Sequence, residues 1–375
     1  MARPTRILLV YNRDYGPAGG GPKLGEEARA GVLLTAQAAE KALSKLEDVE
    51  LVVEGVDSPA MLVEVLDRKG PFDVALNLCE SLRGDPRYEI PVPVLLEARG
   101  IDYTGNPPLA LRQCLDKGKA REALDAARVP IPAGGFLTDR AQLAHMPDLP
   151  VPAIVKPGRQ DGSIGIESGS VVRTRLALER RVAHVIDELG QPAVVEAFID
   201  GREFNVSILG DLEPRCLPIA EIDFSGMPAN APKIVSYKAK WHKKTKEYKG
   251  TVPVYDTTDE TLARRLRKAA LGAFRALSLR DYARVDLRVD SQGRPFVVDV
   301  NPNCDIAPDA GFPRSAAKAG LDYEALLQTL LGFALDRRKR RPSRDPHSTG
   351  SGGSSARGGS TPDRKSRAAS PERRP

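Results

Sequence analysis

The stretch Tyr282-Ala-Arg-Val-Asp-Leu-Arg-Val289, followed by Pro295-Phe-Val-Val-Asp-Val-Asn301, decides how this chain is interpreted. Both runs are rich in β-branched residues and alternate apolar with polar side chains, which is typical of strands. Only five residues, including Asp290 and Gly293, separate the two runs, which form a hairpin if they are adjacent in the fold.

Polar side chains gather on one face of this hairpin. Alternate residues of a strand share a face, so Arg284 lies beside Asp286, and Asp299 lies beside Asn301. If the two strands are adjacent, three oxygen-bearing side chains meet next to one guanidinium. Such oxygen ligands suit Mg²⁺, a hard ion that usually shares its coordination shell with phosphates. The hairpin therefore predicts a site for nucleotide chemistry.

The composition is that of an ordinary globular protein with an unusual end. The chain has 375 residues, enough for two or three domains, with 41% apolar and 28% charged residues. Residues 337–375 carry 12 Lys/Arg and 3 Asp/Glu, so the overall charge of +6 leaves residues 1–336 at −3. A mildly acidic core gives no reason to expect nucleic acid on it. The basic, Ser/Gly/Pro-rich tail is predicted to be disordered, and weak contact with RNA is expected at most there.

Several classes of protein are not indicated. The four cysteines show no CxxC pair, and no Cys/His spacing suggests zinc. Neither a signal peptide nor an apolar stretch of membrane-spanning length is present, so a reduced, cytoplasmic setting is expected.

The order of predicted elements indicates an α/β protein. Up to residue 108, strands alternate with amphipathic helices, which predicts a doubly wound, mainly parallel sheet. Its expected strands are Arg6–Tyr11, Val49–Val53, Phe72–Leu78 and Ile101–Tyr103. We expect further divisions at residues 109–190, 191–336 and 337–375. Their expected elements are strands Ala153–Lys156, Ser170–Arg173, Ala193–Phe198, Phe204–Leu209 and Cys216–Asp223, and helices Leu176–Leu189, Thr258–Leu277 and Tyr323–Leu335.

Two glycine-rich loops are candidate phosphate-binding sites, and the second is the better candidate. The loop from Gly16 to Gly25 lacks the Gly-Lys-Ser/Thr of a P-loop and the third glycine of a dinucleotide fingerprint. The loop after Lys156, Pro-Gly-Arg-Gln-Asp-Gly-Ser-Ile-Gly165, leaves a strand and lets backbone N–H groups converge on phosphate. Ser163 can add a hydroxyl and Lys156 a charge.

Two further features leave alternatives open. Glu196 and Glu203 flank an Asp-Gly turn and could bind a ribose or an exocyclic amine, although taken alone the pattern favours a solvated hairpin. Residues 232–250 contain seven lysines and the only tryptophan, Trp241. They form either a solvated basic loop or a lid that brings Lys238 or Lys240 onto phosphates.

The order of these parts, over roughly residues 5–335, resembles the ATP-grasp superfamily and within it the D-alanine–D-alanine ligases. The resemblance implies a doubly wound N-terminal domain followed by a two-lobed ATP-grasp α+β fold, with a small lobe over residues 109–190 and a large, metal-binding lobe over residues 191–336. It also implies ATP and Mg²⁺ (or Mn²⁺) as cofactors.

The resemblance implies roles for individual residues. Lys117 and Lys156 match the family's two ATP-contacting lysines, Ser163 the working serine of the phosphate-covering loop, and Lys240 the lysine that meets the γ-phosphate. The adenosine is assigned to Glu196, to the backbone through Ile199, and to Glu203. The metal is assigned to Asp286, Asp299 and Asn301. Arg284 matches the arginine that stabilises the tetrahedral intermediate, and with Lys240 and Ser163 it makes the catalytic set.

Departures from the family concentrate on the amino-acid side. The stretch Pro302–Phe312 replaces the family's glycine-methionine-threonine turn and Ser-Leu pair, and Asn77–Ser81 replaces its histidine-glycine loop. Glu26 or Glu27 would have to stand in for the acidic residue that holds the first substrate's ammonium. Nucleotide chemistry therefore transfers by resemblance, and D-alanine specificity does not.

The function expected from the sequence is that of an ATP-dependent carboxylate–amine ligase. It would form an amide or peptide bond through an acyl phosphate, with an amino-acid or peptide carboxylate and an amine as substrates. An ATP-binding regulatory or scaffold protein that uses its basic tail, and a small-acid kinase, are the alternatives. Because relatives are often dimers, a homodimer is also expected.

Overall fold

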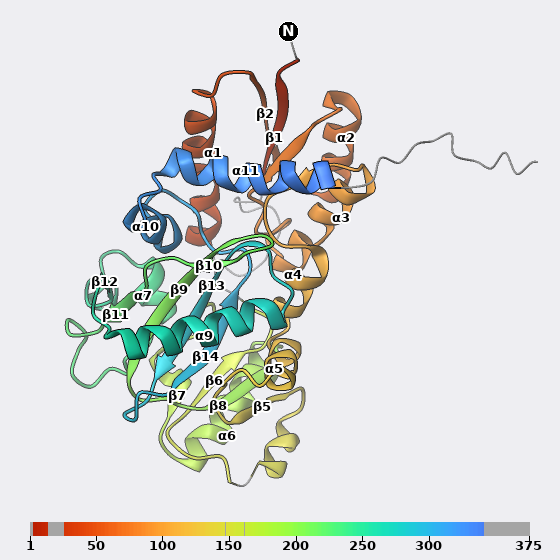
Figure 1. The fold of residues 1–375 in the computed structure, drawn as a ribbon. Coiled ribbons are helices and arrows are strands. Elements are labelled where there is room, and N and C mark those ends of the chain that lie inside the picture. The colour runs from red at the N-terminus through yellow and green to blue at the C-terminus, as the bar shows by residue number, and fades with distance from the viewer. Residues whose placement is uncertain (1–2, 14–25, 147, 161, 341–375) are drawn as a thin grey trace, which may run out of the picture. The chain divides into compact units, whose positions relative to one another are not determined.

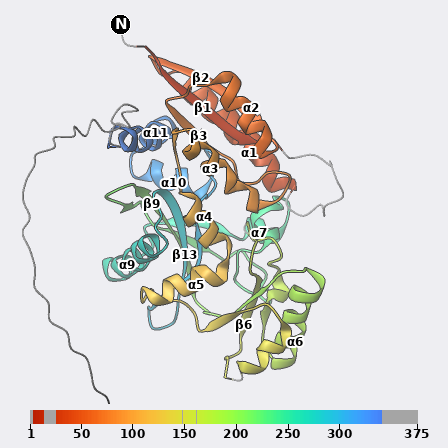
Figure 2. The ribbon, with the colours of Figure 1, turned by 90° about the vertical axis from the view of Figure 1, so that its right-hand side faces the viewer.

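The protein is described by a computed structural model that covers residues 3–13, 26–146, 148–160 and 162–340. In these residues the chain forms three β-sheets with flanking helices. Figures 1 and 2 show the N-terminal sheet at one end, the sheet containing β6 and β8 at the other, and the sheet containing β9 and β13 between them.

The N-terminal sheet is parallel and covered on both faces, as expected. Its strand order is β2-β1-β3-β4, and it consists of β1 (Thr5–Asn12), β2 (Val49–Val56), β3 (Val74–Asn77) and β4 (Asp102–Tyr103). Ile7 and Leu9 of β1 pack with α1 (Glu26–Leu43) and α11 (Tyr323–Arg340). Leu8 and Val10 pack with α2 (Pro59–Lys69) and α3 (Pro91–Ala98). Alternate residues of one strand thus feed two separate cores, which is the mark of a doubly wound sheet.

The second sheet is antiparallel and has the order β5-β8-β6-β7. Its strands are β5 (Gly134–Leu137), which the sequence did not predict, β6 (Ala153–Pro157), β7 (Val171–Val172) and β8 (Ala193–Ala197). One face packs on α6 (Arg175–Ala183), which continues as a π-helical turn, His184–Glu188. Because β8 pairs with β5 and β6, the change to the next sheet falls after Ala197, later than the expected division at residue 190.

The third sheet has the order β12-β11-β9-β13-β14, with β10 beside β9. Its strands are β9 (Arg202–Gly210), β10 (Arg215–Cys216), β11 (Ala220–Asp223), β12 (Val252–Tyr255), β13 (Asp281–Val289) and β14 (Pro295–Asn301). The single strand expected over Cys216–Asp223 is wrong: it is broken around Pro218, which has no N–H for the ladder.

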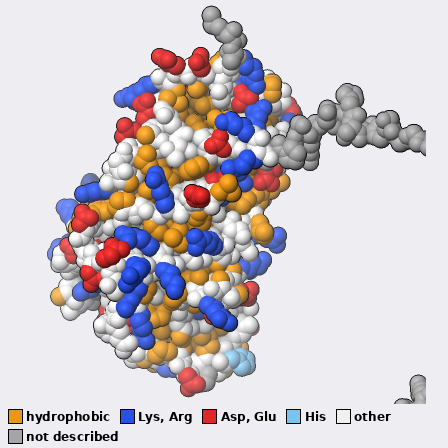
Figure 3. Space-filling view, in the orientation of Figure 1, with side chains coloured by type: hydrophobic (Ala, Val, Ile, Leu, Met, Phe, Trp, Pro, Cys, Tyr) orange, Lys and Arg blue, Asp and Glu red, His pale blue; other side chains and the backbone are white. Residues whose placement is uncertain are grey.

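Helix α9 (Glu260–Ala276) covers this sheet with its apolar face, which is built from Leu266, Ala270 and Phe274. Its outer face is basic, and Figure 3 shows Lys and Arg side chains gathered there. The exposed basic residues of α9 are Arg264, Arg265, Arg267, Lys268 and Arg275. Helices α4 (Pro108–Leu115) and α5 (Lys117–Ala126) contribute to the same core.

The remaining elements are short or lie near the end of the described chain. Short 3₁₀ turns occur at Pro86–Glu89, Arg140–His145 and Ser168–Ser170. The lysine-rich segment contains the short helices α7 (Tyr237–Trp241) and α8 (Lys246–Lys249), and α10 (Gly311–Lys318) precedes α11. No helix among the described residues is both long and apolar enough to span a bilayer.

The expected start of the tail at residue 337 is wrong. Helix α11 continues to Arg340 because its basic end has acidic partners on other elements. Arg337 donates to Asp281, and Arg338 donates to Asp73 at 2.8 Å. The disorder predicted for the tail concerns residues 341–375, which lie outside the described residues.

Candidate active site

The candidate site is built on one face of the third sheet. In the register of β13 and β14, Asp286 lies opposite Asp299 and Arg284 opposite Asn301. On the other side of β13, Asn205 of β9 lies opposite Asp286. Strand pairing therefore brings together the polar residues that the sequence placed on one face of each strand.

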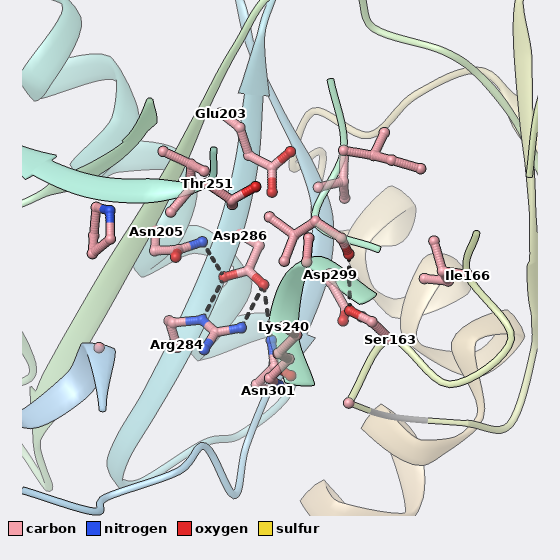
Figure 4. Close-up of a pocket in the computed structure, with 18 of the residues that line it drawn as sticks. Ser163, Ile166, Glu203, Asn205, Lys240, Thr251, Arg284, Asp286, Asp299 and Asn301 are labelled. Atoms are coloured by element: carbon pink, nitrogen blue, oxygen red, sulfur yellow. Dashed lines mark hydrogen bonds and ion pairs between the residues drawn. The ribbon is translucent and has the colours of Figure 1, made fainter. Parts of the chain in front are cut away.

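Asp286 is the best-anchored carboxylate of the site. It accepts hydrogen bonds from Arg284 Nε at 2.7 Å and Nη2 at 2.8 Å, from Asn205 Nδ2 at 2.8 Å, and from Asn301 Nδ2 at 3.2 Å. Figure 4 shows these side chains converging on it. The bidentate guanidinium fixes the plane of the carboxylate, and the four hydrogen bonds use its four acceptor positions, so a metal ion bound here would replace one of them.

Asp299 is held as an anion by two lysines from other elements. Its carboxylate accepts a hydrogen bond from Lys117 Nζ at 2.8 Å. Burial by itself raises the pKa of Asp299, but the charges of Lys117 and Lys156 outweigh burial and lower the pKa below its ordinary value. Asp299 is thus ionised at neutral pH.

A β-bulge in β14 provides an anchor for Lys156. The pairing with β13 passes from Asp286–Asp299 directly to Leu287–Val297, so Val298 has no partner in that ladder. Its carbonyl instead accepts a hydrogen bond from Lys156 Nζ at 3.0 Å. The same ammonium lies 2.6 Å from Glu196 Oε2 of β8, so Lys156 joins two strands of the second sheet to Val298 of the third.

The phosphate-loop candidate and the lysine-rich segment contact each other. Gly162 and Ser163 both have positive φ, +64° and +62°, which turns the loop sharply. Ser163 Oγ donates to the carbonyl of Val235 at 3.0 Å, and Trp241 Nε1 donates to the carbonyl of Gly162 at 2.9 Å. For residues 232–250 the sequence left two alternatives, a solvated basic loop and a lid. These contacts favour the lid, since the segment lies against the loop rather than standing free in solvent.

Lys240, next to Trp241, faces the anionic side chains. Burial, followed by the charge of Arg284, lowers the pKa of Lys240, while Asp286 and Asp305 oppose that shift. Its Nζ lies 5.1 Å from the centroid of the Trp241 ring. Lys238, the other lysine considered for this role, is exposed and does not line the cavity described below.

The end of the site assigned to adenosine lies where β8 passes into β9. Glu196 is buried between Arg121, which donates to it, and Lys156. Glu203, also buried, accepts a hydrogen bond from Arg288 Nη1 at 2.6 Å. Burial raises the pKa of Glu203, and the charge of Arg288 opposes the rise.

All the candidate residues line one cavity of about 1040 Å³. This volume lies at the upper end of the range for small-molecule sites. The candidates that line it are Lys117, Lys156, Ser163, Glu196, Ile199, Glu203, Lys240, Arg284, Asp286, Asp299 and Asn301. Sequence reasoning missed Asn205, although the alternation Glu203, Asn205, Ser207 along β9 carries the same signal as the opening hairpin.

The oxygen donors fit a hard divalent ion. Two carboxylates and one amide face each other across β13 and β14. Asp299 has acceptor positions beyond its hydrogen bond from Lys117, and Asn301, which donates through Nδ2, keeps its amide oxygen as a ligand. Mg²⁺ takes few protein ligands and fills its shell with water and phosphate oxygens. Within the described ranges no three His, Cys, Asp or Glu residues form a metal-binding group, so the set of donors that would fit the ion includes the amide of Asn301.

The cavity continues past the metal candidates toward the amino-acid side. This part of its wall includes Asp305, Asp309 and Arg314, together with Gly31 of α1 and Gly311 of α10. Cys304, beside it, is buried, and burial raises the pKa of its thiol to about 12, so it is a neutral packing residue. The side chains of Glu26 and Glu27, considered for ammonium binding, lie outside the described part.

The chain has recognisable relatives. A family model described as D-ala D-ala ligase C-terminus matches residues 136–332. The D-alanine–D-alanine ligase of Desulforudis audaxviator is 30% identical over 323 residues, which are 82% of this chain and 99% of that protein. An uncharacterized protein of Sinorhizobium fredii, y4sG, is 32% identical over 73% of this chain and 80% of its own length.

The fold also matches solved structures. The crystal structure of the Bacillus anthracis D-alanine–D-alanine ligase complexed with ATP has a TM-score of 0.69 and 24% sequence identity. The match covers 90% of this chain and 99% of that one. At this identity the likeness establishes the fold, including the expected doubly wound domain and ATP-grasp lobes, and no substrate.

Proposed function

The chain belongs to the D-alanine–D-alanine ligase family of ATP-dependent ligases, and from that premise we propose that it joins a carboxylate to an amine through an acyl phosphate. One observation carries the proposal. The Arg284–Asp286 pair, its cross-strand partners Asp299 and Asn301, and lysines from other elements line a single cavity.

The proposed first step is phosphoryl transfer. A carboxylate oxygen of the acid attacks the γ-phosphorus of ATP, and ADP leaves with the electrons of the broken P–O bond. Lys156 and Lys240 supply positive charge and alignment, which are the main demands of such a transfer. Mg²⁺, when bound by Asp286, Asp299 and Asn301, supplies further charge neutralisation at the phosphates.

The proposed second step is amide formation. The amine nitrogen attacks the carbonyl carbon of the acyl phosphate, the tetrahedral intermediate expels phosphate, and the nitrogen loses a proton. Arg284, held in place by Asp286, is the donor for the developing oxyanion. Loss of one such donor typically raises the barrier by roughly 2.7–4 kcal/mol. The contact between the Ser163 loop and the Trp241 segment supports exclusion of water from the acyl phosphate.

The residues that bind the nucleotide are proposed from the family resemblance and from their place in the same cavity. We assign the adenine to Glu196 and the backbone through Ile199, and the ribose to Glu203. We assign the triphosphate to Lys117, Lys156 and Ser163, with Lys240 at the γ-phosphate.

The substrates are proposed by class only. The relatives are named for D-alanine, but Asp305, Asp309 and Arg314 give this cavity charges of both signs on the amino-acid side. We therefore propose an amino acid or peptide as the acid and an amino compound as the nucleophile. We further propose that the protein works in the cytoplasm as a homodimer, which light scattering of the purified chain would test.

The test is ADP release from purified protein with ATP, Mg²⁺ and a panel of amino acids and dipeptides, with products identified by mass spectrometry. Amine-dependent ADP release and an amide product are expected, and Asp299→Asn should remove both. Asp290→Asn is the matched control, because Asp290 caps the turn between β13 and β14 outside the cavity. A wild-type protein that neither binds nor turns over ATP would contradict the proposal.

The alternatives leave different products. A small-acid kinase would accumulate a phosphorylated acid and release no phosphate. A scaffold protein would bind ATP without turnover and would lose its partner when residues 341–375 are removed. The full set of charged residues in the cavity supports an enzyme over a scaffold.

A further inference from the structure

Arg288 lies at the assigned nucleoside end of the cavity, and neither the sequence nor the proposed mechanism uses it. It sits on β13, opposite Glu203 of β9 in the strand register. Arg288 is 4% exposed and Glu203 7% exposed, yet both line the cavity. Figure 4 shows Glu203 pointing into the same space as Asp286. A buried arginine this close to a binding cavity requires an explanation.

Most N–H groups of the Arg288 guanidinium donate to acceptors from one turn of the chain and one neighbouring segment. Its Nε donates to the carbonyl of Ile199 at 2.7 Å, and its Nη2 donates to the carbonyl of Gly201 at 3.0 Å. Its Nη1 donates to Glu203 Oε2 at 2.6 Å and to the carbonyl of Lys233 at 2.8 Å. Four of its five N–H groups are therefore used within the protein.

The turn that Arg288 holds has no ladder of its own. Strand β8 ends at Ala197 and β9 begins at Arg202, so the residues between them belong to no strand. The carbonyls of Ile199 and Gly201 are directed onto the guanidinium, whose carbon lies 4.8 Å from the centroid of the Phe198 ring. Among the described residues, nothing accepts a hydrogen bond from the N–H of Ile199, and this residue lines the cavity.

We propose that Arg288 is the positioning residue of the nucleoside site. It holds the turn from Phe198 to Glu203 so that the open N–H of Ile199 meets the base and the Glu203 carboxylate meets the ribose. The proposal rests on the proposed function, which assigns adenosine to this turn. Arg288 itself contacts neither the phosphates nor the reacting carboxylate.

The geometry requires arginine rather than any other cation. A planar fork of fixed N–H groups can satisfy two carbonyls and a carboxylate at once, whereas the ammonium of lysine has three donors on a flexible stem. Removal of the fork leaves these acceptors buried and unpaired. The turn would then rearrange toward water or other donors, and the nucleoside would lose its preformed contacts.

The experiment compares two ligands of the whole protein by calorimetry, Mg·ATP and Mg·tripolyphosphate. Tripolyphosphate reports on the phosphate site alone, whereas ATP also reports on the nucleoside site. Arg288→Met should weaken ATP binding by about tenfold or more, the equivalent of one hydrogen bond to a charged group. Binding of tripolyphosphate should stay within about twofold of wild type. Arg288→Lys keeps the charge without the fork, so its affinity for Mg·ATP should lie between those of wild type and Arg288→Met. Its affinity for tripolyphosphate should equal that of wild type.

Arg267→Met is the matched control, because Arg267 is an exposed arginine of α9 that pairs with Glu260 outside the cavity. Its affinities for both ligands should equal those of wild type. If Arg288→Met does not fold, Arg288→Lys decides the matter alone. Equal losses for both ligands, or unchanged ATP affinity, would overturn the inference. Failure of the wild type to bind ATP would instead sink the proposed function.

Discussion

Several charged residues of this cavity are buried in pairs of opposite charge. Lys117 pairs with Asp299, and Lys156 with Glu196. A buried charge that loses its partner is costly, so the removal of one member is expected to disturb the other. A triphosphate brings new anionic partners for these lysines, so nucleotide binding must redistribute the contacts inside the cavity.

The single tryptophan offers a direct report of that redistribution. Lys240 Nζ lies near the face of the Trp241 ring, and the indole N–H donates to Gly162. Under the proposed assignment of Lys240 to the γ-phosphate, nucleotide binding would draw the cation away from the ring. Addition of Mg·ATP should therefore change the tryptophan emission in a saturable way. Nucleotide binding seen by calorimetry without any change in emission would contradict this placement of Lys240.

The polar residues of the opening strand pair were predicted to share one face because each lies in a local pattern. Arg284 with Asp286, and Asp299 with Asn301, share strand faces by simple alternation. Asn205 shows the same alternation but was overlooked, because its role appears only when β9 is placed beside β13. The roles of Lys156 toward Val298 and of Arg288 toward Ile199 depend on long-range contacts that no local pattern encodes.

At the level of elements, the differences from prediction have local causes. The bulge at Val298 shifts the register of β14, and the residues on either side of Val298 carry no sequence signal that predicts it. Strand β8 belongs to the second sheet although β9, which follows it directly, belongs to the third. The sequence could not predict this, because the partners of β8, strands β5 and β6, are distant from it in sequence. The short helices within residues 232–250 have caps at Ser236 and Thr245, a signal that was available but outweighed by the lysine content.

Helix α11 gives the clearest test at this scale. Arg337 donates to Asp281 Oδ2 at 2.9 Å and to the carbonyl of Tyr103, and Asp281 is 0% exposed. Arg337→Met leaves that carboxylate buried without its cation. It should lower the free energy of unfolding by about 3–5 kcal/mol, measured by urea denaturation.

The control for this prediction lies three residues further on. Arg340 pairs with Asp211 near the surface, so Arg340→Met should cost about 1 kcal/mol or less. Similar losses for the two variants would show that the buried pair does not anchor the end of the helix.

For the described part of the chain as a whole, three sheets built from consecutive segments are joined by contacts between residues far apart in sequence. The alternation of strands and helices was enough to predict the doubly wound domain, and the order of motifs was enough to indicate the ATP-grasp lobes. The amino-acid side of the cavity was not predictable. Its wall combines α1, α10 and the turn after β14, and their meeting depends on the assembly of all three sheets.

Asp73 shows how the assembly responds to pH. Burial raises its pKa, but hydrogen bonds from the Arg6 backbone N–H and from Arg3, together with the charge of Arg338, lower the pKa below its ordinary value. A lowered pKa contributes stability above the ordinary value of 3.8, and this contribution is lost as the pH falls through the folded value.

The corresponding variant is Asp73→Asn. It should destabilise the protein by about 1 kcal/mol at pH 7, because its arginine partners are largely exposed. The difference from wild type should shrink as the pH is lowered below 4, in urea unfolding at a series of pH values. A difference that stays constant down to pH 3 would show that the charge of Asp73 is not responsible.

The central claim, an acyl phosphate formed from ATP, is tested most directly by oxygen transfer. The acid found in the substrate panel is prepared with ¹⁸O in its carboxylate and turned over with ATP and the amine. The account predicts that one ¹⁸O atom of each acid consumed appears in the released inorganic phosphate, because the carboxylate oxygen that attacked phosphorus leaves with it. Phosphate without ¹⁸O, released while the amide forms, would contradict the account.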